Sequence, residues 1–239
     1  TDPALKFVAA NNDEVTIASP NTISASGALT LSAWVKPDFT NLSKAVCGDA
    51  TGDTDRLYCG TNGALNKIAV ALTINDIANA SDEVDADGTE WNHIAVCRAA
   101  SGTTVYYYIN GVLVGNSGAK VGNDANWELG SIGRYGTNTS ADWNGHIADL
   151  RLYNVDLSTA GTTHGPIQTL ASKINGAYER ASSTQPLGWY KLNEGTGNPA
   201  DSGSGNKAGV NVGADWVFDQ FSVAVQDTMT TLSLIHISE

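Results

Sequence analysis

The Asn110-Gly111 pair between two short apolar runs constrains the fold of this chain more than any other local pattern. The run before it, residues 105–109, is Val-Tyr-Tyr-Tyr-Ile, and the run after it, residues 112–114, is Val-Leu-Val. β-Branched and aromatic residues favour strands. Asn-Gly favours the positive φ values of a type I′ turn, whose twist matches that of the flanking antiparallel strands. The pattern therefore predicts a β-hairpin.

Strand-like runs continue along the first 155 residues. Residues 29–35 alternate strictly, which places Leu29, Leu31, Ala33 and Val35 on one face and Thr30, Ser32 and Trp34 on the other. Further strands are predicted at 67–72, 91–97 and 146–153; in the last of these we expect Ala148, Leu150 and Leu152 on one face and Asp149, Arg151 and Tyr153 on the other. Twenty-five glycines and only six prolines indicate many turns between short strands. An all-β antiparallel fold follows.

One segment departs from this pattern. Residues 166–174 suit a short helix with Pro166 in its first turn, so we predict one helix near 167–180. A connector over 182–186 follows it. Strand-like sequence then returns at 187–192 and near Trp216.

The charge balance limits the classes of partner. Thirteen Lys and Arg against 25 Asp and Glu give a formal charge of −12, which disfavours nucleic acid, because phosphate binding relies on basic side chains. Neutral sugars, Ca²⁺ and cationic surfaces remain open as ligands. No run of 18 apolar residues occurs, so the chain is not expected to span a membrane.

The three cysteines leave two interpretations. Cys47 and Cys59 flank a polar loop and could pair across a hairpin, with Cys97 as a buried thiol. Alternatively, all three are buried free thiols, since Cys commonly behaves as a small hydrophobe. Neither their number nor their spacing to His indicates a zinc site.

Four stretches in order resemble a known family. They are Ala4–Phe7 with Val15–Ile17; Leu29–Pro37; Trp91–Val96 with the Asn110-Gly111 hairpin; and Ile132-Gly133-Arg134 followed by Trp143–Ser158. Together they resemble the laminin-G-like jelly rolls of bacterial and viral surface proteins, within the concanavalin A-like lectin/glucanase superfamily. The resemblance implies a two-sheet antiparallel jelly-roll sandwich and an extracellular, cell-surface or virion location.

The resemblance also suggests how the chain is divided. Residues 1–158 form the main jelly roll, 159–186 the helix and connector, and 187–221 resemble the opening strands of such a unit, displaced to its end. We favour an arrangement in which 187–221 folds back and completes the sandwich, because its apolar residues would otherwise lack a partner face. The start of a truncated second repeat is the alternative.

The last eight residues, 232–239, resemble the conceptual translation of a sequencing adapter. We interpret them as an artefact of a metagenomic sequence whose natural chain continues past about Thr231, and exclude them from the fold argument. A genuine apolar edge strand is the alternative.

No catalytic residue is predicted. Glycosidases of this superfamily use paired carboxylates on one strand, and the family motif Glu-x-Asp-x-x-Glu is absent. Glu83 and Asp85 have the required i, i+2 spacing but lie in a glycine-containing acidic loop. We therefore expect a protein that is not an enzyme.

Two loops combine the residue types that bind sugars, which are an aromatic face for the ring and polar groups for the hydroxyls. The residues expected to bind ligand are Asp124, Asn126 and Trp127 in loop 123–128, and Arg134, Tyr135, Asn138 and Asp142 in loop 134–144. Trp127 is the preferred stacking platform because polar residues flank it. Trp143, Trp34 and Trp91 are expected to pack inside.

Three acidic clusters compete as a Ca²⁺ site, because Ca²⁺ is bound by six to eight oxygens. They are residues 11–14, the group Asp49, Asp53 and Asp55, and the group Asp82, Asp85 and Asp87. The loop with Asp49, Asp53 and Asp55 is preferred. The family's frequent Phe-Asp-Gly after the first strand is Phe7-Val8-Ala9 here, which argues against Ca²⁺ at that strand.

The sequence thus predicts a non-catalytic carbohydrate-binding or adhesion module with a glycan or glycoconjugate as partner. A structural jelly roll that self-associates in a capsid, fibre or surface layer is the alternative. A glycan hydrolase ranks third.

Overall fold

The computed structural model describes residues 3–40, 42–52, 54–61, 66–74, 77–80, 84–102, 104–117, 126–137, 139–158 and 185–218. Within these ranges the chain forms strands and two short 3-10 helices. The strands are β1 (Ala4–Phe7), β2 (Glu14–Ile23), β3 (Leu29–Pro37), β4 (Ser43–Gly48), β5 (Arg56–Thr61), β6 (Lys67–Ile74), β7 (Ile77–Ala80), β8 (Val84–Asp85), β9 (Asn92–Arg98), β10 (Val105–Ile109), β11 (Val112–Asn116), β12 (Trp127–Ile132), β13 (Gly145–Tyr153), β14 (Gly188–Tyr190), β15 (Val210–Val212) and β16 (Asp215–Val217). The 3-10 helices are η1 (Ala9–Asn11) and η2 (Thr139–Ala141).

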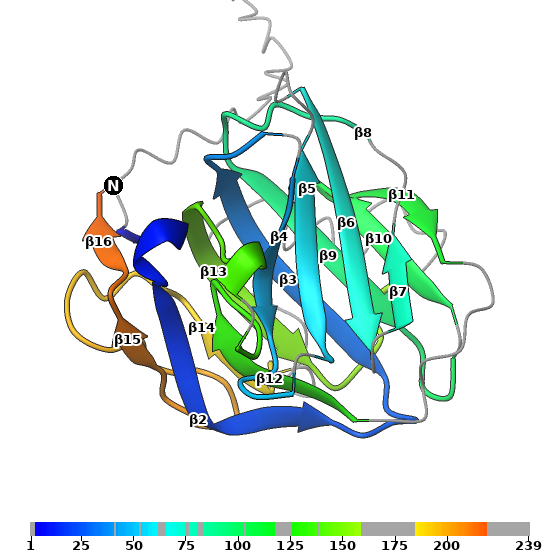
Figure 1. Cartoon of the computed structure of the whole chain (residues 1–239). Coiled ribbons are helices and arrows are strands. Elements are labelled where there is room, and N and C mark those ends of the chain that lie inside the picture. Colours follow the sequence, from blue (N-terminus) through cyan, green and yellow to red (C-terminus); the bar gives the residue numbers. More distant parts are fainter. Residues whose placement is uncertain are drawn as a thin grey trace, which may run out of the picture.

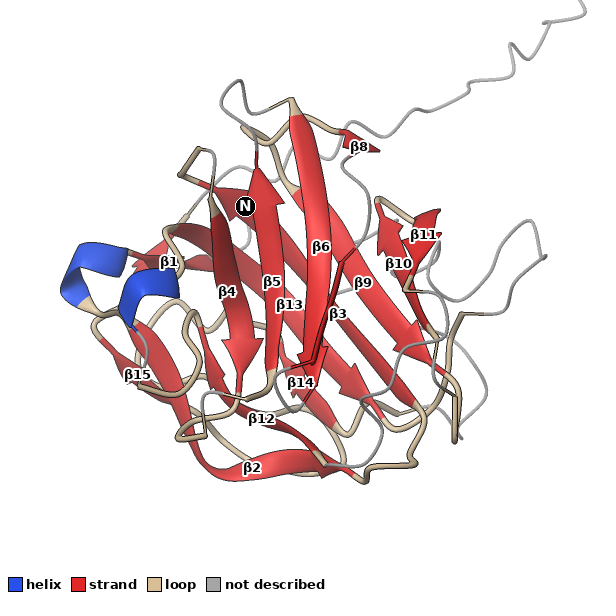
Figure 2. Cartoon of the chain, turned by 45° about the vertical axis from the view of Figure 1, so that its right-hand side comes forward, coloured by secondary structure: helices blue, strands red, loops and turns tan. Residues whose placement is uncertain are grey.

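These strands form two antiparallel sheets that pack face to face (Figure 1). The first sheet has the order β11-β10-β9-β3-β13-β1-β16, and β14 also pairs with β13. The second sheet has the order β15-β2-β12-β4-β5-β6-β7, and β8 also pairs with β6. Figure 2 shows β4, β5 and β6 as one layer in front of β3, β9 and β13. The predicted all-β antiparallel sandwich is confirmed.

The hairpin at Asn110-Gly111 forms as predicted. β10 pairs antiparallel with β11, from Ile109 opposite Val112 to Tyr106 opposite Asn116. The two turn residues have φ values of 50° and 79°, as a type I′ turn requires.

Every second residue along a strand points into the core between the sheets. On β3, the predicted inward residues Leu29, Leu31, Ala33 and Val35 all belong to the main apolar cluster. The opposite side of this strand is buried as well, since Trp34 is 3% exposed and packs with Trp91 in a separate cluster. The prediction that these two tryptophans are buried is confirmed, although they lie outside the inter-sheet core.

A bulge in β13 breaks the alternation predicted there. The register between β13 and β3 shifts between Ala148 and Arg151, and Asp149 has a φ of 48°. Leu150 and Leu152 point into the main core, whereas Ala148 packs with Trp34 on the other side of the sheet. The expected common face for Ala148, Leu150 and Leu152 is therefore wrong, because the extra residue reverses the side-chain direction.

The segment 187–218 contributes strands to both sheets. β14 pairs with β13, β16 pairs with β1, and β15 pairs with β2. Tyr190 and Leu192 join the main core. The division of the chain into units remains a prediction, and the helix near 167–180 and the final residues 232–239 lie outside the described residues.

The cysteine alternatives are resolved. Cys47, Cys59 and Cys97 are buried free thiols. The register of β4 and β5 places Cys47 opposite Leu57 and Cys59 opposite Lys44, so the two cysteines do not face each other. In the described part of the chain, no helix is long and apolar enough to cross a membrane.

Candidate functional site

Trp127 lies in the core rather than on the surface. It begins β12, opposite Ile23 of β2, and is 0% exposed within the main apolar cluster. A ring that presents no face to solvent cannot stack on a sugar, so this part of the site prediction is wrong. Its neighbour Asn126 is exposed and its side-chain oxygen accepts a hydrogen bond of 3.1 Å from the Ala25 amide. Asp124 lies outside the described residues.

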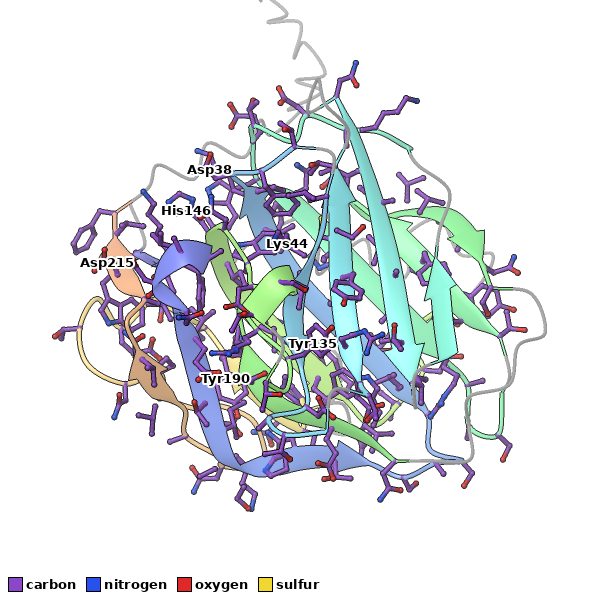
Figure 3. All side chains as sticks on the ribbon, viewed as in Figure 1. Asp38, Lys44, Tyr135, His146, Tyr190 and Asp215 are labelled. Atoms are coloured by element: carbon purple, nitrogen blue, oxygen red, sulfur yellow. The ribbon has the colours of Figure 1, made fainter. Side chains whose placement is uncertain are left out.

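The second predicted loop folds onto the outer surface of the second sheet. Tyr135 packs against β4, and Gly48 permits this contact because a Cβ there would lie 2.6 Å from the Tyr135 Cβ. The backbone amide of Gly136 donates to the Asp49 carbonyl at 2.7 Å. At the other end of the loop, the Lys44 ammonium donates to the Ser140 carbonyl at 2.8 Å. Tyr135 and Lys44 both lie near β4 in Figure 3.

Tyr135 meets two residues of β5 that the sequence analysis did not select. The Tyr135 and Tyr58 rings meet edge to face with centroids 5.8 Å apart. The Arg56 guanidinium carbon lies 4.8 Å from the Tyr135 centroid and 5.5 Å from that of Tyr58. Burial and a hydrogen bond with Tyr135 raise the pKa of Tyr58, so its hydroxyl stays protonated at neutral pH.

Small side chains surround this group on β5 and β6. Leu57 and Cys59 point inward, so Arg56, Tyr58 and Gly60 face outward, and the burial pattern of β6 alternates in the same way. Across the strands, Tyr58 lies opposite Ala71 and Gly60 opposite Ala69. We name this surface the Tyr58 face, made of Arg56, Tyr58, Gly60, Ala69, Ala71 and Tyr135. A partly exposed aromatic ring thus stands on a floor of small residues.

A charged group lies behind the loop. Arg134 contacts Asp142 at 3.6 Å and Glu14 at 3.9 Å. Asp142 is 0% exposed, and within the described part of the chain neither of its carboxylate oxygens has a hydrogen-bond partner. Burial raises the pKa of Asp142 to about 6, although the charge of Arg134 opposes the shift. Arg134 and Asp142 therefore support loop 134–144 from behind. Asn138 of this loop lies outside the described residues.

The preferred Ca²⁺ loop is organised by its own hydrogen bonds. One Asp49 carboxylate oxygen accepts from both the amide and the hydroxyl of Thr54, each at 3.1 Å. Asp55 accepts from the Glu128 amide at 3.1 Å. Asp49 and Asp55 are both buried, and Asp53 lies outside the described residues. Among the residues that are described, no group of three or more His, Cys, Asp or Glu could hold a metal ion.

The remaining predicted aromatic residue lies where expected. Trp143 is 0% exposed and packs edge to face on Phe39, with centroids 5.1 Å apart.

The site that the structure brings together keeps Tyr135 from the predicted set and adds Tyr58 and Arg56. The signal for these two was available, because residues 56–60 alternate between polar or aromatic and apolar residues.

Comparisons with known proteins agree with this fold. A family model for the concanavalin A-like lectin/glucanases superfamily matches residues 9–161. A heptameric SAP-like pentraxin from Limulus polyphemus has a TM-score of 0.65 and 16% identity, and the match covers 92% of this chain and 96% of that one. A Bacteroides ovatus protein described as carbohydrate-binding has a TM-score of 0.59 and 16% identity, over 90% of this chain and 59% of that one. Comparison with curated proteins gave no match.

Proposed function

Because this chain belongs to the concanavalin A-like lectin/glucanase superfamily, we propose that it is a non-catalytic carbohydrate-binding module of a secreted, cell-surface or virion protein. The ligand lies on the Tyr58 face. Similarity of fold to the Bacteroides ovatus protein supports a binding role only in general terms. The choice of site depends on this chain's own residues.

The observation that carries the proposal is the position of Tyr58. Its ring is partly exposed and is held by Tyr135 and Arg56. On β6, Ala71 lies opposite Tyr58, and Ala69 lies opposite Gly60 of the same strand as Tyr58. Pyranose rings present C–H groups that pack on aromatic faces, and their hydroxyls bond to nearby polar groups. Ala69 and Ala71 are partly exposed and have small side chains, and the Tyr58 hydroxyl and Arg56 supply polar groups.

The non-catalytic part of the proposal is based on the same side chains. The outward positions of β5 and β6 hold Arg56, Tyr58, Lys67 and small residues. Glycoside hydrolysis instead uses two carboxyl groups about 5–9.5 Å apart. A binding role suits this composition better than an acid–base role.

A glycan-array measurement, followed by titration of the best hit, tests the proposal. Tyr58→Ala should weaken binding by roughly tenfold or more, since buried aromatic contacts contribute about 1.5 kcal/mol or more. Tyr58→Phe keeps the ring and removes the hydroxyl, so it distinguishes the contributions of the two groups to binding. The control is Tyr106→Ala, which removes a partly exposed tyrosine from the first sheet. Binding that Tyr106→Ala weakens and Tyr58→Ala leaves intact would move the site, and no hit on the array would contradict the function.

Self-association is the second candidate, because one edge of the first sheet is apolar. Val112 and Leu113 on edge strand β11 are 63% and 47% exposed. Exposed apolar edge strands favour pairing between chains. Light scattering of the purified protein tests this candidate: a stable oligomer that Val112→Lys dissociates would support it, and a monomer at high concentration would exclude it.

A further inference from the structure

Exposed large apolar side chains gather at two edges of the sandwich. Among the described residues six such side chains are exposed, and five of them lie on or directly beside edge strands: Val112 and Leu113 on β11, Val210 and Val212 on β15, and Phe218 after β16. Single exposed apolar residues are common on protein surfaces, whereas grouped ones mark interaction sites. Their position at the edges points to contacts with another chain.

The two groups lie on opposite sides of the molecule. β11 and β16 are the two ends of the first sheet, and β15 is an end of the second sheet. Only Gly213 and Ala214 separate β15 from β16, and Figure 1 shows these two strands together on the side away from β11. We name Val112 and Leu113 the β11 patch, and Val210, Val212 and Phe218 the β15–β16 patch.

The β11 patch is better suited to side-chain packing than to a long β-ladder. Tyr108 lies opposite Leu113 and Tyr107 lies opposite Gly115, so Val114 is an extra residue that forms a bulge. A bulge bends an edge strand and interrupts its row of backbone groups. We therefore expect Val112 and Leu113 to contact a partner through their side chains.

The charges beside the patches allow a second copy to approach. Each copy has a formal charge of −12, so two copies repel unless they meet through nearly neutral surfaces. β10, β11 and β15 contain no charged residue. Asp215 of β16 lies opposite Lys6 of β1. Glu14, opposite Val212, contacts Arg134 at 3.9 Å. Each of these two acidic side chains thus has a basic neighbour, and physiological salt screens charges beyond about 8 Å.

The opposite positions of the patches determine the geometry of association. A contact between the β11 patch of one copy and the β15–β16 patch of another is heterologous, so it leaves one free patch at each end and copies add in a row. A symmetric contact between two β11 patches would stop at a dimer. That dimer would leave Val210, Val212 and Phe218 exposed, whereas the heterologous contact covers both patches.

We infer that copies of this chain associate head to tail, with the β11 patch of one copy packed on the β15–β16 patch of the next. This arrangement rests on the second candidate, self-association, and specifies its geometry. It is independent of glycan binding, because β5 and β6, which carry Tyr58 and its neighbours, are interior strands of the second sheet.

Sedimentation velocity of the purified full chain over a range of concentrations tests this arrangement. Val112→Glu blocks the β11 patch and Val210→Glu blocks the β15–β16 patch, with the same change of charge. Leu42→Glu is the matched control, because Leu42 is the sixth exposed side chain, at 50%, and precedes β4, an interior strand. Val112→Ser and Phe218→Ser repeat the test without a new charge, and urea unfolding checks that each variant is folded.

The parent chain should form species whose average size rises steadily with concentration. Val112→Glu and Val210→Glu should each raise the dissociation constant by roughly tenfold or more, since a charge replaces a valine that the contact buries. An equimolar mixture of these two variants should form dimers and nothing larger, because each variant keeps one intact patch. Leu42→Glu should associate as the parent chain does.

Three other results would overturn the arrangement, and each has a different meaning. A parent chain that stays monomeric at high concentration would contradict self-association itself. A Val210→Glu variant that still dimerises, beside a monomeric Val112→Glu variant, would show a symmetric contact through β11. Equal weakening by Leu42→Glu would show that net charge, and not the two patches, determines association. Glycan binding measured on the array would remain a separate result in all three cases.

Discussion

The indole N–H of Trp189 donates a hydrogen bond of 2.7 Å to the carboxylate of Asp149, 40 residues earlier in the chain. The same carboxylate accepts from two nitrogens of Arg151, at 2.7 and 2.8 Å, and the Arg151 guanidinium lies 4.4 Å from the Trp189 ring centroid. The bulge in β13 places Asp149 and Arg151 side by side with this geometry. These three residues connect β14 to the rest of the first sheet.

Asp149→Asn should destabilise the fold by about 3–5 kcal/mol, because it leaves the Arg151 charge buried without its counterion. Asparagine tolerates the positive φ at this position, so the change tests the charge and not the bulge. Urea unfolding measures the effect. The double variant Asp149→Asn, Arg151→Leu should recover part of the lost stability, and a double variant no more stable than Asp149→Asn would contradict this explanation.

Sequence alternation predicted much of the fold, because both sheets have one face on a shared core. It succeeded for β3 and for the hairpin at Asn110-Gly111. It failed at Ala148, where a bulge reverses the side-chain direction, and no residue type announces that bulge in advance. Trp127 was misassigned because its polar neighbours suggested a loop, whereas β2 pairs with this segment and buries the ring. Alternation over residues 56–60 indicates that Tyr58 faces outward, but its contact with Tyr135 of loop 134–144 joins distant segments, and no sequence pattern predicts that contact.

Asp142 should make the fold less stable as pH rises through its titration range. Its pKa is raised from an ordinary 3.8 to about 6 in the native state, so between these values the native state binds the proton more tightly than the unfolded state does. The unfolding free energy therefore decreases as pH rises from about 4 to 6, by up to about 1.4 kcal/mol per pH unit.

Asp142→Asn should remove this contribution. Urea unfolding at several pH values compares the variant with the parent chain and with Asp38→Asn, which makes the same charge change at an exposed side chain. The difference between Asp142→Asn and the parent chain should grow in favour of the variant as pH rises from 4 to 6. A difference that does not change with pH would refute the assignment.

His93 should have the opposite effect over an overlapping range. Burial lowers its pKa from 6.5 to about 3, with a contribution from the Arg151 charge, so only the unfolded state binds a proton between these values. Stability due to this group is present above about pH 6.5 and is lost as pH falls toward 3.

His93→Gln should therefore flatten the acid side of the stability profile, even though losing the edge-to-face contact with Trp34, at 5.5 Å, lowers stability at every pH. NMR titration of the histidine side chains gives an independent check. A His93 ring that becomes protonated near pH 6 in the folded protein would exclude this effect.

Gly133 connects the stability of the fold to the proposed binding surface. It has a φ of +82°, and a Cβ there would lie 2.4 Å from Cδ1 of the fully buried Phe7 ring. Its amide donates to the Val46 carbonyl and its carbonyl accepts from the Trp143 amide, each at 2.8 Å. These bonds fix both ends of the loop that carries Tyr135.

Gly133→Ala should therefore destabilise the fold by about 2–5 kcal/mol, the sum of about 1–2 for the left-handed backbone and about 1–3 for a steric clash that the packed core cannot relieve. Gly197→Ala is the matched control, because Gly197 has a similar φ of +71° but nothing within 4 Å of its Cβ position. That variant should lose only the backbone contribution, about 1–2 kcal/mol. Equal losses in the two variants, measured by urea unfolding, would show that the Phe7 contact does not restrict this position. Under conditions where Gly133→Ala remains folded, its glycan affinity should also fall, because Tyr135 and Tyr58 would no longer be held in register.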